Sequence, residues 1–384
     1  MKKLLMFIAG LVFVTPVWAE NTLTLPQGRL RARLKPIYAS NIKQRYDHDR
    51  SKISLVSDFE KALDVEAAKQ FNPQLALLMR GHGLLSIGTF IPSLSLSTLV
   101  LGTAMEYGVT DNLTFGVTVP IVTANTKFGL HFAKTDEALQ AEQLDPRLAL
   151  DFAHLAEKKA IAQGYRPFEN WNKTGLGDIE AGFKYRFLRT NALAMTTKAG
   201  VRLPTGRADD PDHLTDIGFG DGQTDLGTTL LIDYLGIPHL LINALAKYTL
   251  QLPDKQLMRI PEKGELFTKN REELDRNLGN QWDASLYTEY QFLSLFNINA
   301  AYNYVVKEAD RYHSNSGLNT DRLELHSKMM KQTADMGIGF STVPWVQQGA
   351  FTIPMDVSLT ASWPITGQNV ARAQTVDLEY KLYF

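Results

Sequence analysis

Charged side chains at every second position are the most suggestive chemical feature of this chain of 384 residues. Near the N-terminus, four basic residues alternate with apolar or small ones: Arg29, Arg31, Arg33 and Lys35. Because successive side chains of a β-strand point to opposite faces, these cations share one face. A row of this kind either pairs with acids on neighbouring strands or lines a path for a solute.

Other segments carry charges in the same alternating way, which predicts a common interior. The candidate lining residues are Arg29, Arg31, Arg33, Lys35, Glu106, Asp178, Glu180, Lys198, Arg202, Asp225 and Glu379. Across one predicted hairpin, Asp178 and Glu180 should approach Lys198 and Arg202. Ion pairs that fill a narrow interior and a selectivity lining for a permeant both remain open interpretations.

Closure of the sheet would bring distant charges together. The first strand would lie between the strand of Glu106 and the strand of Glu379. Arg31 and Arg33 would then face acids on both sides, as buried charges require.

The catalytic and metal-binding patterns in the sequence predict no site. Residues 313–317 (HSNSG) approach the His-x-Ser-Asn-Gly motif of outer-membrane phospholipases, but His313 and Ser314 are neighbours and point to opposite faces of a strand. The acidic loop at 209–221 lacks the spacing of a calcium-binding loop, and the eight histidines lack metal-ligand spacing. We therefore expect no catalytic residues, no metal and no cofactor.

The elements that position these charges follow a period of two. Apolar and polar residues alternate in twelve segments, at 29–38, 98–109, 112–122, 175–188, 191–203, 225–234, 240–251, 282–292, 296–304, 333–340, 351–363 and 375–384. The last segment shows the pattern most clearly, with apolar residues at 376, 378, 380, 382 and 384. The fold predicted is all-β, a transmembrane antiparallel up-and-down β-barrel of about twelve strands.

The connections between these segments support a barrel. Short turns alternate with long loops, and an even strand number places both termini in the periplasm. Aromatic residues gather at two levels, as expected at two membrane interfaces. The level near the short turns holds Tyr107, Tyr185, Phe187, Tyr234, Tyr290, Phe292, Phe296, Tyr380 and Phe384, and the other level holds Tyr38, Tyr248, Trp282, Tyr304 and Trp363.

Two long loops have helical spacing, at 58–79 and 137–164, with proline breaks at Pro73 and Pro146. We expect them to be extracellular, and either to cap the barrel mouth or to fold inward as a constriction. The apolar stretch 83–97 predicts an extra strand or an inserted plug. The role of segment 40–96 is left open.

The N-terminal residues predict a secretory signal peptide. Lys2 and Lys3 precede an apolar stretch at 4–14, and small residues lead to an expected cleavage after Ala19. The predicted organisation is a signal peptide at 1–19 and an outer-membrane β-barrel at 20–384. The chain has no cysteine, and its net charge of −1 gives no basic excess for nucleic acid. A mean hydropathy of −0.17 is compatible with a barrel, because half of each strand is polar.

Two stretches resemble a known family. GLGDIEAGFKYRF at 175–187 is similar to a strand of the putative MetA-pathway of phenol degradation outer-membrane proteins, and LPTG at 203–206 with GFGDGQTDLG at 218–227 is similar to the following hairpin. The resemblance implies an outer-membrane channel linked with aromatic or other hydrophobic small molecules. It implies no catalytic residue.

The sequence therefore predicts a channel of the Gram-negative outer membrane for passive passage of small hydrophobic or aromatic compounds. An outer-membrane hydrolase and a structural or adhesive barrel are the alternatives. The expected partners are outer-membrane lipid and lipopolysaccharide, the permeant, and the barrel-assembly machinery acting on the final strand, which ends at Phe384.

Overall fold

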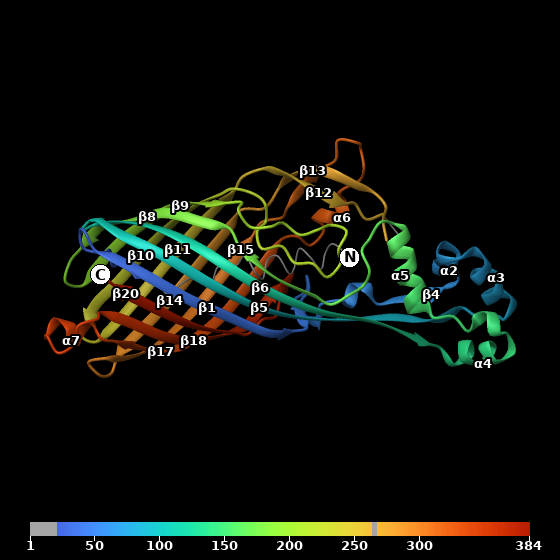
Figure 1. The fold of residues 1–384 in the computed structure, drawn as a ribbon, viewed down its shortest axis with the longest axis horizontal. Coiled ribbons are helices and arrows are strands. Elements are labelled where there is room, and N and C mark those ends of the chain that lie inside the picture. Colours follow the sequence, from blue (N-terminus) through green and yellow to red (C-terminus); the bar gives the residue numbers. More distant parts are fainter. Residues whose placement is uncertain (1–20, 263–266) are drawn as a thin grey trace.

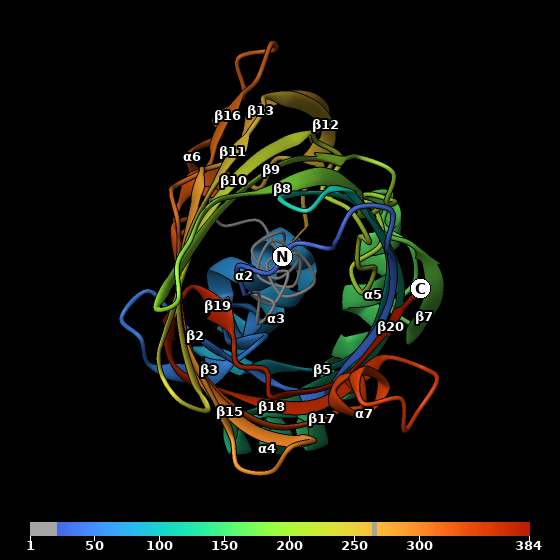
Figure 2. The same ribbon diagram turned by 90° about the vertical axis from the view of Figure 1, so that its left-hand side faces the viewer.

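Twelve long strands close into a barrel in the computed structural model, which describes residues 21–262 and 267–384. Seen end-on, the strands form a ring (Figure 2). The ring closes because the first strand pairs on one side with the last strand and on the other with the second, antiparallel in both cases. The predicted twelve-stranded antiparallel barrel is confirmed, while the expected leader at 1–19 lies outside the described residues.

Each barrel strand lies beside the next one in the chain, so the topology is up-and-down. The strands are β1 (Leu30–Ile42), β5 (Ser86–Thr110), β6 (Leu113–Lys134), β8 (Ile179–Arg189), β9 (Leu193–Leu203), β10 (Asp225–Ile237), β11 (Leu240–Gln251), β14 (Gln281–Gln291), β15 (Phe296–Lys307), β17 (Met329–Ser341), β18 (Met355–Gln368) and β20 (Thr375–Tyr383). We call the end with the tight turns and the C-terminus the short-turn end, and the opposite end the long-loop end.

The β5–β6 hairpin is much longer than the period-two segments indicated. It projects beyond the long-loop end, where β4 (Lys61–Asp64) adds to β5 (Figure 1). β7 (Trp171–Leu176) pairs with β6 lower down, at the level of the second half of β1. The stretch 83–97 is therefore no plug: residues 86–97 continue β5, and residues 88–97 are paired to β6.

Both long loops contain the expected helices, α2 (Val65–Phe71), α3 (Pro73–Gly81), α4 (Asp136–Leu144) and α5 (Phe152–Ala162). Pro73 begins α3, and Pro146 begins the short 3-10 turn η2 (Pro146–Leu148) that separates α4 from α5. The helices sit around the outer part of the hairpin, so the alternative in which they fold inward as a constriction is wrong (Figure 1). Their apolar faces are buried against Phe90 and Phe132 of the hairpin, which draws them away from the barrel.

The other connections contain short strands and helices. They are β2 (Gln44–Tyr46), β3 (Lys52–Ser54), η1 (Ser57–Phe59), β12 (Asp254–Arg259), β13 (Arg271–Asn277), β16 (Arg311–His313), α6 (Asp321–Glu324), α7 (Val343–Gln347) and β19 (Val370–Ala371). The prediction that the eleventh strand begins at 351 is wrong. Phe351 and Ile353 belong to the connection after α7, and the ladder resumes at Met355, whose backbone exchanges hydrogen bonds with Thr342.

The outer face of the barrel is an apolar belt. Trp282 is 55% exposed and Phe384 61% exposed, and residues of both predicted aromatic levels share this exposure. A closed sheet whose outer side chains are apolar and whose inner ones are charged is suited to a bilayer. None of the described helices combines the length and the apolar character needed to cross a bilayer.

Four glycines form a row across the inner wall. Gly116, Gly182, Gly200 and Gly227 are successive ladder partners on β6, β8, β9 and β10. A Cβ atom on Gly182 would lie 2.6 Å from the Ala199 carbonyl oxygen and 2.9 Å from the Gly200 Cα atom. The row lets the strands approach closely and leaves this part of the wall bare of side chains.

We predict that Gly182→Ala destabilises the barrel by about 1–3 kcal/mol, because its methyl group would collide with neighbouring backbone. Gly227→Ala is the matched control, since a Cβ atom there would meet only Lys247 Cε, at 4.0 Å. The check is the temperature at which the compact electrophoretic form is lost in detergent. Equal transition temperatures for the two variants would contradict the steric argument.

Candidate functional site

The charges of the predicted row pair across the closure of the barrel. Arg31 Nε donates to Glu106 on β5. Arg33 Nη2 lies 2.6 Å from Glu379 Oε1 on β20, and Arg33 Nη1 lies 3.5 Å from Glu106 Oε1. These arginines thus face acids on both neighbouring strands, because the register places β1 between the two acidic rows.

Further along the same strand, Lys35 Nζ lies 3.2 Å from Asp377 Oδ1. Both side chains are more than nine-tenths buried. Burial of two charges in a barrel wall is tolerated when each has an opposite partner, so this pair holds β1 to β20 from the inside.

A second group of charges lies on β8, β9 and β10. Arg202 forms an ion pair with Asp225, and Glu180 is its ladder partner on the other side. Asp178 does not approach Lys198 as expected. Its carboxylate instead accepts a hydrogen bond from the Gly206 amide at 2.9 Å, because it precedes β8 and turns toward the loop after β9.

The predicted lining residues separate into three sets by position. Seven of them border a cavity inside the barrel, namely Arg31, Arg33, Glu106, Glu180, Lys198, Arg202 and Asp225. Lys35, Asp178 and Glu379 are each more than nine-tenths buried in contacts of the wall or rim. Arg29 is exposed at the short-turn end before β1 begins and does not border this cavity. The role of this set in permeation stays a prediction.

The segment at 21–28 runs inside the barrel, which the strand pattern did not indicate. Thr22 donates to Asp233 Oδ2 through its amide (2.8 Å) and its hydroxyl (2.7 Å). The Thr22 carbonyl accepts from the Thr196 hydroxyl at 2.8 Å, and the Leu25 amide donates to the Thr114 hydroxyl at 2.8 Å. We call this segment the inner strap.

The inner strap narrows the barrel interior. Asn21 and Leu23 border the same cavity as the glycine row, and the Asn21 carbonyl accepts a hydrogen bond from Lys184 Nζ at 2.5 Å. One signal in the sequence pointed to it. Asp233 is an inward acid whose ladder partners are Ala194 and Asn243. Neither neighbouring strand therefore provides a basic partner for its charge, and another segment has to supply donors.

A larger cavity lies at the long-loop end, between the projecting hairpin, α2, α5 and the loop residues at 211–214, 259–262 and 267–268. Its volume is 1500 Å³. We call it the outer cavity. Its aromatic lining residues are Phe59, Phe71, Phe90, Phe128, Tyr165, Phe168 and Phe267.

Several of these rings contact one another and join the hairpin to the loops. The centroids of Phe128 and Phe168 are 5.5 Å apart, those of Phe168 and Phe267 are 5.9 Å apart, and those of Tyr165 and Phe267 are 5.6 Å apart. The lining also contains charged side chains such as Lys61, Glu66 and Lys159, so the aromatic residues form the apolar part of a mixed wall. A concave site with such an aromatic part accommodates a small apolar or aromatic molecule. Sequence reasoning missed this site, because its walls come from segments far apart in the chain.

One buried arginine holds the wall of the outer cavity together. Arg259 Nε lies 2.8 Å from Asp212 Oδ1, and its terminal nitrogens donate to the backbone carbonyls of Gly164 (2.8 Å) and Thr268 (2.6 Å). Its guanidinium carbon lies 3.8 Å from the centroid of the Tyr165 ring. A rigid, fully bonded guanidinium of this kind fixes three loops relative to one another.

The serines of the phospholipase-like stretch bind a carboxylate rather than a histidine. The hydroxyls of Ser314 and Ser316 donate to Glu272 Oε2 at 2.6 and 2.5 Å. This geometry closes a turn against β13 and does not form a nucleophile–base pair.

Asp47, His48 and Asp49 are the one described group whose carboxylate and imidazole atoms lie near enough to hold a metal ion. Asp47 Oδ1 already accepts the amides of Asp49 and Ser51, as in an ordinary turn.

Comparison with known proteins identifies the fold. No protein-family model and no curated protein matches the chain. Among solved structures, the COG4313 outer membrane channel from Pseudomonas putida F1 is similar, with a TM-score of 0.57 and 10% identity over 96% of this chain and 100% of that chain. The chain has the fold of an outer-membrane channel.

Two further structures align more loosely. A Pseudomonas aeruginosa FadL homologue matches with a TM-score of 0.38 and 10% identity, over 98% of this chain and 92% of that chain. The Ralstonia pickettii toluene transporter TbuX also has a TM-score of 0.38, with 11% identity over 95% of this chain and 92% of that chain. Membership of the phenol-degradation family stays a prediction.

We predict that Asp233→Ala loosens the inner strap and raises single-channel conductance in planar bilayers. The variant loses two hydrogen bonds to a charged acceptor, each worth about 1.5–3 kcal/mol, so the displaced strap should become at least about ten-fold more populated. Asp335→Ala is the control, because that inward acid binds Asn303 rather than the strap. Unchanged conductance in the Asp233 variant would show that the strap does not limit passage.

We also predict a pH-dependent turn at β13, outside the membrane belt. Hydrogen bonds from Ser314 and Ser316 lower the pKa of Glu272 from 4.5 to about 2. A lowered carboxyl pKa stabilises the folded turn above pH 4.5, and this contribution is lost as the pH falls to about 2.

Amide hydrogen exchange at Asn315 and Ser316 measures this effect, since both amides donate to Glu272 Oε1. Their protection should fall across that pH range in the wild type and be low throughout in Glu272→Gln. Glu273→Gln, on the neighbouring exposed position, should behave as the wild type does.

Proposed function

We propose that this protein is a passive channel that carries small hydrophobic or aromatic compounds across the outer membrane. The observation that supports the proposal most is the outer cavity, an aromatic-lined space of 1500 Å³ held at the long-loop end of a closed barrel. Such a space concentrates apolar solutes from water by removing their surface from solvent. The likeness of two stretches to the phenol-degradation family agrees with this substrate class.

The route continues through the barrel interior. The glycine row offers a strip of wall without side chains, while the facing charges at the β1 seam are paired with each other. Paired charges present a weaker field than isolated ones, so an uncharged solute passes them without separating ions. The inner strap lies on this route and sets how much of it is open.

In this proposal the long-loop end faces outward. The even number of strands places both termini on the same side, and the short turns at that end place it in the periplasm. The solute then moves down its own concentration gradient, from the outer cavity to the short-turn end. No residue is asked to react with it, and the arrangement needs no cofactor.

The test is uptake of toluene by Gram-negative cells that express the chain, compared with cells that lack it. Ala62 is exposed in β4 and borders the outer cavity, so Ala62→Trp should fill part of that space. The tryptophan ring should deprive the solute of about 1.4 kcal/mol of apolar contact with the cavity, which corresponds to about a ten-fold lower uptake rate. Ala162→Trp, at an exposed alanine that ends α5, is the matched control and should leave uptake unchanged.

Surface expression and heat-modifiable migration are measured for every variant, so that misfolding is recognised. Equal toluene uptake with and without the wild-type chain would overturn the proposal. With full surface expression, that outcome would leave a structural or adhesive barrel. Equal reduction by both tryptophan variants would show that the outer cavity is not on the route.

A further inference from the structure

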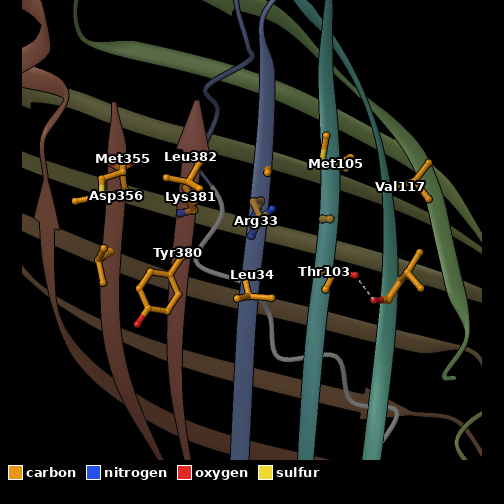
Figure 3. A pocket seen from close by; sticks show the side chains of 14 residues that line it. Arg33, Leu34, Thr103, Met105, Val117, Met355, Asp356, Tyr380, Lys381 and Leu382 are labelled. Atoms are coloured by element: carbon orange, nitrogen blue, oxygen red, sulfur yellow. Dashed lines mark hydrogen bonds between the residues drawn. The ribbon is translucent and has the colours of Figure 1, made fainter. Parts of the chain in front are cut away.

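A second apolar hollow lies on the outside of the barrel wall, at the seam where the chain closes on itself. It has a volume of 620 Å³ and crosses β18, β20, β1, β5 and β6. Figure 3 shows Leu34, Tyr380, Leu382 and Met105 around it, on neighbouring strands. Each of these four side chains is 37–53% exposed on the belt. We call this hollow the seam groove.

The strand register explains why the surface dips here. One row of ladder partners reads Met355, Leu382, Ala32, Met105 and Val117, and the next row reads Val357, Tyr380, Leu34, Thr103 and Val119. Ala32 in the first row and Thr103 in the second are smaller than their neighbours, and they are diagonal neighbours across β1 and β5. The larger side chains on both sides therefore become walls, and these two residues become the floor.

The groove offers hydrocarbon and almost no hydrogen-bonding group. The Thr103 hydroxyl is occupied, because it donates to the Val119 carbonyl at 2.7 Å, the dashed line in Figure 3. Arg33 and Lys381 border the groove only from beneath. Both form ion pairs with Glu379 on the inner face, at 2.6 and 3.0 Å. A ligand of the groove must accordingly be an apolar chain or ring.

The position of the groove selects among apolar ligands. It faces the bilayer, and Leu382 stands two positions before the end of the chain, so the groove lies toward the short-turn end of the belt. Membrane lipid is present at that level at far higher concentration than any solute. A chain lying in a hollow gains contacts on three sides, whereas a chain on a convex wall gains them on one.

The ladder beside the groove is incomplete. On the side of β20, pairing of β1 runs to Leu34 and resumes at Ile37, and the interval contains Pro36. Proline has no amide hydrogen to donate, so the seam is less tightly joined here than between β1 and β5. An apolar chain seated in the groove would lie directly beside this interruption and add contacts across β1 and β20.

We propose that the seam groove holds one acyl chain of a membrane phospholipid in a defined position, and that this lipid stabilises the joint between β1 and β20. The site is separate from the permeation route, because it opens to the bilayer and not to the barrel interior. The proposal stands independently of the substrate of the channel.

Native mass spectrometry of the full chain, purified in a mild detergent from cell membranes, provides the test. The wild type should retain one phospholipid. Ala32→Phe, which places a ring on the floor of the groove, should lower that occupancy about ten-fold. Ala300→Phe adds the same ring at an exposed, outward-facing alanine of β15 and should retain the lipid as the wild type does.

The second measurement is the temperature at which the compact electrophoretic form is lost, with and without added phospholipid. Added phospholipid should raise it in the wild type and in Ala300→Phe but not in Ala32→Phe. Equal lipid retention in all three proteins would mean that the groove holds only ordinary annular lipid, and would overturn the proposal. Retention of added toluene in place of lipid would also overturn it, while leaving the proposed channel intact.

Discussion

Every feature of this protein depends on one constraint, that a sheet in hydrocarbon cannot leave the backbone groups of an edge strand without partners. The chain satisfies it by inserting β1 between β5 and β20. This insertion also brings Arg31 and Arg33 between two acidic rows, so the charges of the interior neutralise one another as the hydrogen-bond ladder closes. Closure of the backbone and compensation of charge are thus achieved by the same register.

Outside the belt, arginines join the loops in addition to the apolar clusters around the hairpin. Arg259 ties three loops to an aspartate and a tyrosine ring, and Arg207 forms a two-nitrogen pair with Asp216 at 2.6 and 2.5 Å. A guanidinium with most of its N–H donors hydrogen-bonded fixes the positions of the loops relative to one another, which short apolar loops cannot do alone. The shape of the outer cavity therefore depends on a few polar joints.

The barrel was predictable because a period of two is a local property, readable in segments such as 375–384. The length of β5 was not predictable, because the same alternation of residues continues beyond the barrel. There the apolar side chains of β5 pack against helices instead of lipid. The pairing of Arg33 with Glu379 followed from closure alone. The inner strap has no period of two, and its one signal in the sequence was the inward acid Asp233. Asp178 was misplaced because it precedes β8 and accepts the Gly206 amide, while Lys198 lies opposite Lys184.

The projecting hairpin also sets how far the protein extends beyond the long-loop end of the barrel. The β1 ladder ends at the pair of Ile42 with Leu96, so ten further residues of β5 rise above it, a reach of about 30 Å. Such a reach is comparable to the thickness of the bilayer core itself. In the proposed channel, the hairpin therefore carries one wall of the outer cavity above the end of the β1 ladder, so that a solute is bound before it reaches the barrel interior.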